Sequence, residues 1–136
     1  MENRYLFRAK RIDNGEWVEG FYCKWLKGKR VVTYSEKETD CIITWMSNGG
    51  MSRYEVDPST ICQCTGMPDE NKKLVFEHDI VWDSDARAFY EIIWNQEDMC
   101  WNVKDADGYK SNFEECYGST IEVNGNSFDN PELLEV

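Results

Sequence analysis

Apolar and polar side chains alternate along much of this chain with a period of two residues. The alternation runs through residues 4–12, stops at the turn-forming segment 13–16, and returns through residues 17–25. A period of two places successive side chains on opposite faces of a β-strand. The pattern therefore predicts two half-buried strands that pair as an antiparallel hairpin.

Short β-prone segments continue through the rest of the chain, with turn-forming residues between them. Further strands are expected at residues 30–34, 41–46, 51–56, 80–82, 89–94, 99–103, 109–111 and 121–123. A short helical turn is expected at residues 112–117. The tail at residues 130–134 carries two leucines, which we expect to dock on the body of the protein.

The stretch 65–73 holds most of the chain's turn-forming residues and predicts a boundary between two subdomains. We expect an all-β fold with little helix, with an N-terminal antiparallel β subdomain at residues 1–66 and a C-terminal β subdomain at residues 67–136. The short strands of the second half have the spacing of a small SH3-like barrel or of an open sandwich, which periodicity does not distinguish.

The composition fits a folded, acidic protein. The 136 residues are enough for one domain or two small subdomains, and 41% hydrophobic with 14% aromatic residues exclude intrinsic disorder. Fifteen basic against 26 acidic side chains give a formal charge of −11, which argues against general binding to phosphate backbones or anionic membranes. The charge is uneven, because residues 1–30 sum to +4 and the remaining residues to −15. We expect two copies to attract one another head to tail, and thus a homo-oligomer.

The sequence has the features of a cytoplasmic protein. Its longest apolar runs, such as residues 41–46, are far shorter than the roughly 20 residues of a membrane helix, and its start lacks the apolar core of a secretory signal. We therefore expect no contact with membranes and a reducing environment. Six cysteines are then expected to be thiols without disulfides: Cys23, Cys41, Cys62, Cys64, Cys100 and Cys116.

Few side chains group in a way that predicts catalysis or metal binding. Cys62 and Cys64 would face the same side of a strand, but only one histidine accompanies them, so small buried hydrophobes are favoured over a zinc site. That histidine, His78, stands between two acidic residues, but no nucleophile is evident and a surface turn is favoured over a general base. We expect no catalytic site, no metal and no cofactor.

Two acidic segments offer oxygen atoms to a divalent cation. They are Asp83-Ser84-Asp85 and Asp105-Ala106-Asp107-Gly108, and in the second the glycine comes too early for a calcium loop. Solvated hairpin turns are favoured for both. A carboxylate-based metal-dependent hydrolase is the alternative, with Asp79, Asp83 and Asp85 as its expected ligands.

Aromatic and basic residues give a second alternative, nucleic-acid binding. Aromatic side chains on a small β-barrel can stack on bases, but the filling of two cores or of a subunit interface is favoured, because the second half is acidic. The basic face of the first strand would supply the contacts to phosphate, through Arg4, Arg8 and Lys10. The six tryptophans are Trp17, Trp25, Trp45, Trp82, Trp94 and Trp101.

Four ordered blocks of the sequence carry a recognisable signature. Phe7-Arg8-Ala9 is similar to an opening F-R-A motif, and residues 56–66 are similar to V-D-P-x-T-(V/I)-x-Q-x-T-G. Residues 69–81 resemble D-x-N-G-K…(E)-G-D-I-V, and residues 122–134 resemble E-V-I-G-N-x-x-x-N-P-E-L-L. Together these blocks resemble the YopX family of phage and prophage proteins. The matching motif positions include Phe7, Arg8, Asp57, Pro58, Gln63, Thr65, Gly66, Asp79, Gly125, Asn126, Asn130 and Pro131.

Several positions depart from the family pattern. Lys72 and His78 stand where the family has glycine, and Asn124 takes an apolar position. Cys62 and Cys64 stand where the family commonly has glycine and tyrosine. Because a glycine is needed mainly where φ is positive, these departures affect turn geometry more than function.

The resemblance implies an all-β fold with an SH3-like C-terminal part, an origin in a mobile element, and no established enzymatic activity. We expect a phage or prophage accessory protein in the cytoplasm of the bacterial host, which binds another protein and is not an enzyme. The alternatives are a nucleic-acid-binding module, an acidic DNA mimic that inhibits a host protein, and the metal-dependent hydrolase.

Overall fold

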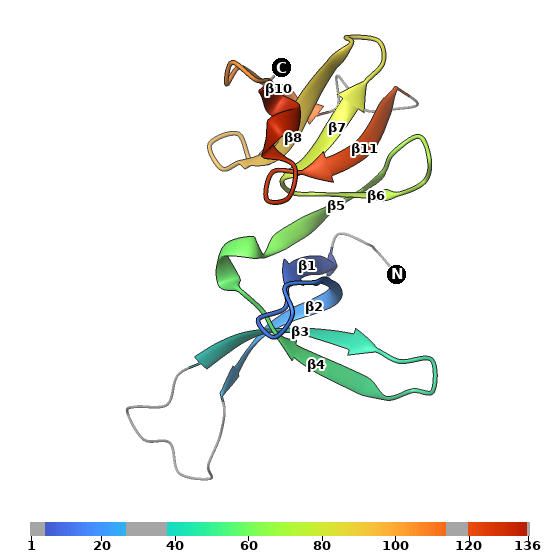
Figure 1. Cartoon of the computed structure of the whole chain (residues 1–136), viewed down its shortest axis with the longest axis vertical. Helices are drawn as coiled ribbons and strands as arrows, with labels where there is room; N and C mark the ends of the chain where they lie inside the picture. The colour runs from blue at the N-terminus through green and yellow to red at the C-terminus, as the bar shows by residue number, and fades with distance from the viewer. Residues whose placement is uncertain (1–4, 27–37, 114–119, 136) are drawn as a thin grey trace. The chain divides into compact units, whose positions relative to one another are not determined.

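A computed structural model describes residues 5–26, 38–113 and 120–135 of the chain (Figure 1). The chain divides into two units, which we call the N-terminal unit (residues 4–63) and the C-terminal unit (residues 64–136). Strands hold about 58% of the described residues and helical turns about 8%, so the prediction of an all-β fold is confirmed. No helix in the described ranges is long and apolar enough to cross a membrane.

The N-terminal unit is an antiparallel sheet with the strand order β4-β3-β2-β1-β5 (Figure 1). Its strands are β1 (Phe7–Lys10), β2 (Trp17–Leu26), β3 (Glu38–Trp45), β4 (Met51–Glu55) and the start of β5 (Cys62–Pro68). β1 and β2 form the predicted hairpin, with Phe7 opposite Gly20. The predicted strand at residues 30–34 lies outside the described residues.

β2 pairs with two different strands along its length. Residues 17–20 pair with β1, whereas residues 21–26 pair with β3. Gly20 stands at the change of partner, where a Cβ atom would collide with the main-chain carbonyl oxygen of Ile43. The residues that follow β4 return to the end of β1 through a bridge between Arg11 and Val56.

The strands of the N-terminal unit share a small apolar core. Ala9, Ile42 and Val56 are fully buried there, and Phe7 and Tyr22 pack against them. Side chains at the alternate strand positions face outward, because successive residues of a strand point to opposite faces. The face of β3 that carries Ile42 therefore lines this core, and the opposite face, which we call the outer side, carries Trp45 together with the buried Cys41.

The C-terminal unit contains the rest of β5, the short strand β6 and a five-stranded antiparallel sheet in the order β10-β9-β8-β7-β11. Its strands are β6 (Leu74–Phe76), β7 (Asp79–Asp83), β8 (Ala88–Asn95), β9 (Cys100–Lys104), β10 (Lys110–Asn112) and β11 (Ile121–Asn126). Their inward side chains form a second core of Val75, Val81, Ile92, Val103, Phe113 and Ile121.

Two features of the C-terminal unit do not follow the sequence predictions in full. Within the described strands, β10 and β11 are the edges of an open sheet, so the SH3-like barrel stays a prediction. β5 extends through residues 65–68, which the sequence assigned to a boundary segment. The predicted helical turn at residues 112–117 lies largely outside the described residues.

Candidate interaction surfaces

The tip of the β3–β4 hairpin exposes three large apolar side chains. Trp45 is 63% exposed, Met51 59% and Met46 50%. Trp45 and Met51 are cross-strand partners and therefore share one face of the hairpin. Tryptophan and methionine are enriched at protein interfaces. We call Trp45, Met46 and Met51 the hairpin surface.

Arg53 and Trp25 form a stacked pair on the outer side of the same sheet. The guanidinium of Arg53 lies 4.4 Å from the ring centroid of Trp25, which is 44% exposed. Arg53 belongs to β4 and Trp25 to β2, so the arginine side chain crosses β3 to reach the ring. The contact holds a planar cation against an aromatic face and keeps both groups at the surface.

Two of the three predicted nucleic-acid contacts converge on one tryptophan. The guanidinium of Arg8 lies 4.8 Å and the ammonium of Lys10 5.4 Å from the centroid of Trp17. Arg8 is only 9% exposed, which leaves little of it accessible to a phosphate. Arg4 lies outside the described residues. The geometry is that of a packed cation–aromatic cluster more than of a row of phosphate contacts.

The first family-motif residues build the N-terminal unit. Phe7 packs in the core, with its ring centroid 5.8 Å from that of Tyr22. Asp57 caps the 3-10 turn of Pro58–Thr60 by accepting the N–H of Ser59 at 3.0 Å, and Pro58 opens that turn. Gln63 is exposed on β5, where it pairs with Phe7.

The central motif residues build turns of the C-terminal unit. The Thr65 hydroxyl donates to the carbonyl of Val75 at 2.8 Å, and Gly66 has a φ of +83°. Asp79 is 1% exposed, and its carboxylate accepts the N–H of Phe76 at 2.8 Å. These side chains satisfy buried backbone groups, which is a structural role.

The last motif block closes a turn after β11. Asn126 accepts the N–H groups of Phe128 at 3.0 Å and Asp129 at 2.9 Å through its side-chain oxygen. A Cβ atom at Gly125 would collide with the side chain of Asn130, and Pro131 opens the final 3-10 turn, Pro131–Leu134. The block therefore requires glycine at 125 for close packing.

His78 lies in the turn between β6 and β7, as predicted, but its side chain is half-buried and paired. Its Nδ1 is 2.8 Å from one carboxylate oxygen of Glu91, and Lys104 Nζ is 3.4 Å from the other. The hydrogen bond to Glu91 raises the pKa of His78 and outweighs the effect of burial. Burial alone would raise the pKa of Glu91, but His78 and Lys104 lower it below its ordinary value. One carboxylate held between Lys104 and a histidine whose pKa is raised is a structural polar network.

The other chemical candidates of the sequence do not converge. Within the described ranges, no group of three or more His, Cys, Asp or Glu side chains is placed to hold a metal ion. Cys62 and Cys64 are buried thiols, and Cys62 donates to the carbonyl of Thr60 at 3.2 Å. Asp83 accepts the N–H groups of Asp85 and Ala86 and so organises a hairpin turn, as expected for this segment.

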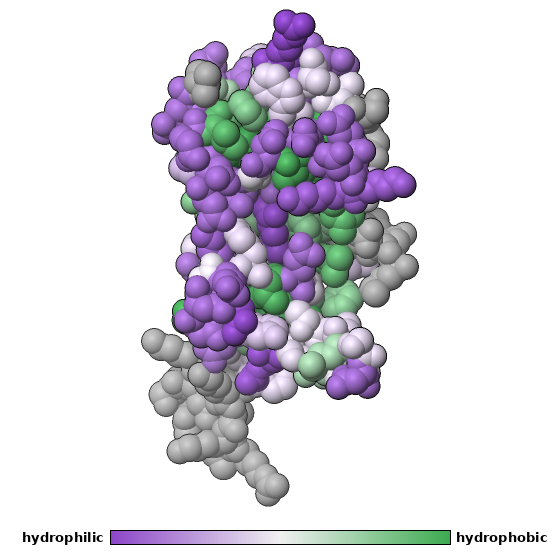
Figure 2. Space-filling view, turned by 45° about the vertical axis from the view of Figure 1, so that its right-hand side comes forward, coloured by the Kyte–Doolittle hydropathy of each residue, from purple (hydrophilic) through white to green (hydrophobic). Residues whose placement is uncertain are grey.

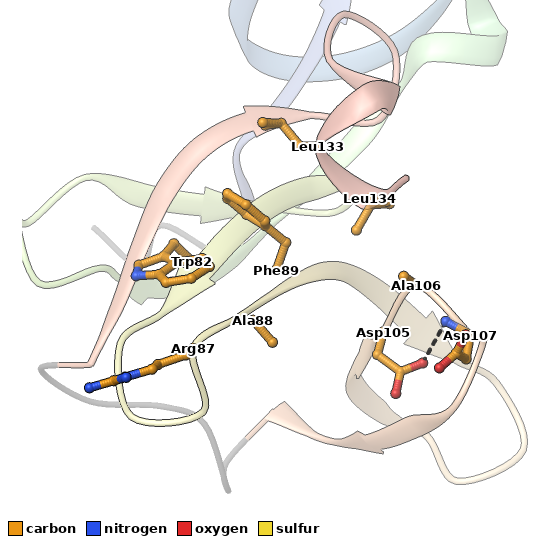
Figure 3. A pocket seen from close by; sticks show the side chains of 9 residues that line it. All are labelled: Trp82, Arg87, Ala88, Phe89, Asp105, Ala106, Asp107, Leu133 and Leu134. Carbon is orange, nitrogen blue, oxygen red and sulfur yellow. Dashed lines mark hydrogen bonds between the residues drawn. The ribbon is translucent and has the colours of Figure 1, made fainter. Parts of the chain in front are cut away.

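A pocket of about 390 Å³ lies in the C-terminal unit (Figure 3). Apolar side chains form its floor, and Asp105 and Asp107 lie at one end. The two tail leucines, Leu133 and Leu134, are half-buried and line it, so the tail docks where the β-sheet presents aromatic rings. The lining residues are Trp82, Arg87, Ala88, Phe89, Asp105, Ala106, Asp107, Leu133 and Leu134.

The two units differ strongly in charge. The N-terminal unit holds ten Lys or Arg and eight Asp or Glu residues, a net charge of +2. The C-terminal unit holds five Lys or Arg and 17 Asp or Glu residues, a net charge of −12. Figure 2 shows hydrophilic residues over most of the drawn face, with smaller hydrophobic areas between them.

Sequence reasoning did not single out the hairpin surface or the pocket. For the hairpin surface, the only local signal in the sequence is a pair of large apolar residues that flank the turn Asn48-Gly49-Gly50. The pocket combines residues from three separate segments, and no local pattern joins them.

Comparison with known proteins agrees with the motif blocks. Residues 6–135 match the family model described as YopX protein, so the match includes the motif residues of both units. No curated protein matches the chain.

Proposed function

This chain belongs to the YopX protein family, and from this premise we propose that it acts by binding another protein and not by catalysis. The proposal includes an origin in a phage or prophage, action in the cytoplasm of the bacterial host, and an SH3-like architecture for the C-terminal unit. The five-stranded antiparallel sheet supports that architecture.

The placement of the motif residues supports a role without catalysis. The motif carboxylates of Asp57 and Asp79 each accept a backbone N–H. The motif amides of Asn126 and Asn130 do the same within one turn. A signature made of capping and turn-forming groups specifies a fold, whereas catalysis needs groups that converge on a reacting atom.

The hairpin surface carries the proposal of a protein partner. Three apolar side chains at least 50% exposed stand together on a unit with a net positive charge. Exposed tryptophan and methionine are costly to leave in water and are typical anchors of protein interfaces. Arg53, stacked on Trp25 nearby on the outer side of the sheet, adds a residue type that interfaces also favour.

The test compares affinity capture by the tagged wild type and by the double variant Trp45→Ser, Met51→Ser. The lysate comes from the host and is either treated with nuclease or left untreated. Met99→Ser is the matched control, because Met99 is 66% exposed but lies in the C-terminal unit. We expect a protein that survives nuclease treatment, is retained by the control and is lost from the double variant.

Other outcomes separate the alternatives. Recovery of nucleic acid alone, lost on changing Lys10 to Glu, would favour the nucleic-acid module. A captured host DNA-binding protein for which this chain and DNA compete would favour the DNA mimic. Stoichiometric binding of magnesium, manganese or zinc in calorimetry, abolished by Asp83→Ala, would favour the hydrolase. Equal capture by the wild type and the double variant would contradict the hairpin surface as the binding site.

A further inference from the structure

Three segments that are distant in sequence frame the pocket of the C-terminal unit (Figure 3). The β7–β8 hairpin supplies Trp82 and Phe89, which are cross-strand partners with ring centroids 4.8 Å apart. The turn between β9 and β10 supplies Asp105 and Asp107, and the last 3-10 turn supplies two leucines. The pocket therefore has an aromatic and aliphatic floor with an acidic end.

Side-chain hydrogen bonds hold the two turns in place. One oxygen of Asp83 accepts the N–H groups of Asp85 at 2.9 Å and Ala86 at 3.2 Å in the first turn. One oxygen of Asp105 accepts the N–H groups of Asp107 at 3.0 Å and Tyr109 at 2.9 Å in the second. A pocket with preformed walls loses less conformational entropy when a ligand binds.

The floor is apolar but still open to water. Trp82, Phe89, Leu133 and Leu134 are only half-buried, although side chains of this kind are normally buried in a core. The volume of about 390 Å³ is within the range of small ligand pockets. An occupant that covers the floor would gain the free energy of apolar burial.

The charges around the pocket determine which class of ligand it favours. Asp105 and Asp107 stand at one end of the pocket, and Arg87 lies at the opposite side in Figure 3. The net charge of −12 on this unit attracts cations and repels nucleic acids and anionic surfaces. A ligand that meets both conditions combines an apolar group with a positive charge.

We propose that this pocket binds a peptide segment of a partner protein in which an aromatic or aliphatic side chain stands next to a lysine or arginine. The apolar side chain covers Trp82 and Phe89, and the cation faces Asp105 and Asp107. This site lies in the C-terminal unit and goes beyond the proposed function, because it is independent of the hairpin surface in the N-terminal unit.

The test uses two defined peptides and two charge variants. The first peptide, acetyl-Gly-Lys-Trp-Leu-Lys-Gly-amide, has the proposed chemistry, and in the second both lysines are replaced by glutamate. The full-length protein is titrated with each peptide by calorimetry and by amide chemical shifts. Asp107→Lys changes the acidic end of the pocket. Glu97→Lys makes the same charge change on an exposed residue of the β8–β9 turn, outside the pocket.

We expect saturable binding of the lysine peptide with shifts at the amides of Ala88 and Ala106. Asp107→Lys should weaken it about tenfold or more, and Glu97→Lys less than about threefold. Equal weakening by both variants would assign the binding to general electrostatics and overturn the proposal. Absence of saturation, or equal binding of the glutamate peptide, would overturn it as well. Neither result depends on Trp45 or Met51, so failure here is distinct from failure of the hairpin surface.

Discussion

At the scale of single residues, Lys72 and His78 are two of the four described side chains that occupy backbone conformations that favour glycine; the others are Arg87 and Met99. Lys72 has a φ of +65° and His78 a φ of +67°. The left-handed region costs a side chain roughly 1–2 kcal/mol, because Cβ approaches the following carbonyl oxygen. These are the two positions where the family pattern has glycine, so the departures noted in the sequence fall where geometry makes them costly.

Replacing Lys72 by glycine should therefore stabilise the protein. Lys72 is exposed, so we expect relief of backbone strain to exceed the entropy that glycine adds to the unfolded chain, with a net gain of about 0.5–1 kcal/mol. Urea unfolding measures the difference. Lys73→Gly is the control, because Lys73 is exposed and has no positive φ, and it should be neutral or destabilising. A loss of stability in Lys72→Gly would contradict the strain.

The His78–Glu91 pair should make stability depend on pH. The pKa of His78 is raised in the folded protein, so its contribution is complete below the unfolded value of 6.5 and is lost as pH rises through the folded value. The pKa of Glu91 is lowered, so its contribution is present above 4.5 and is lost as pH falls through the folded value. The pair stabilises most between about pH 4.5 and 6.5.

The variant His78→Gln tests this dependence, because glutamine keeps a polar side chain without the charge. We expect the difference in unfolding free energy between wild type and variant to be largest between about pH 4.5 and 6.5 and to shrink as the pH rises through the raised folded pKa of His78. Urea unfolding over a pH series measures it. A difference that does not change with pH would show that the charge of His78 has no part in stability.

At the scale of elements, the change of partner along β2 joins the β1–β2 hairpin to β3. Gly20 lets β2 approach Ile43 closely and change partner from β1 to β3. We expect Gly20→Ala to destabilise the protein by about 2 kcal/mol or more, because the added methyl group meets main-chain atoms that cannot move freely. Gly50→Ala is the control, since its Cβ would meet the flexible side chains of Asn48, at 3.1 Å, and Met46, at 3.9 Å, and no main-chain atom among its nearest contacts. Equal thermal unfolding of the two variants would contradict this role of Gly20.

Most strands could be predicted from the sequence, because each carries alternating side chains over several residues. The change of partner along β2 could not be predicted, because the alternation continues through Gly20 without a break and says nothing about which strand pairs with which part of β2. β6 was missed because it spans only Leu74–Phe76, too short for a period to show. The sequence pattern did not predict the 3-10 turn after Asp57, whose capping bond to Ser59 explains the motif.

At the scale of the whole molecule, the candidate sites were harder to predict than the fold. Whether Trp45 is exposed depends on which face of its strand the rest of the protein covers. Both faces of this strand carry apolar side chains, so the sequence does not show which face is covered. The pocket needs tertiary contacts between the β7–β8 hairpin, residues 105–107 and the tail. Charge asymmetry, in contrast, is a property of the sequence, and the division of the chain at Gln63 assigns a net charge of +2 to one unit and −12 to the other.

That asymmetry leads to the last prediction, which concerns self-association. One unit has a net charge of +2 and exposes the hairpin surface, and the other has a net charge of −12. Unlike surfaces on two copies attract head to tail, which gives a heterologous contact that closes into a ring or extends. We expect light scattering at high micromolar concentration and low salt to give a mass above the 16.0 kDa of one chain.

Added salt and one substitution distinguish an electrostatic contact between copies from an apolar one. Because the Debye length falls to about 3 Å at 1 M salt, added salt should return the mass toward one chain. Arg53→Glu should have the same effect at low salt, since it reverses a charge on the outer side of the positive unit, whereas the pocket control Glu97→Lys should leave association in place. A mass of 16.0 kDa for the wild type under all of these conditions would contradict self-association. A mass that grows with added salt would instead assign the contact to the apolar hairpin surface, because salt weakens charge attraction and strengthens apolar burial.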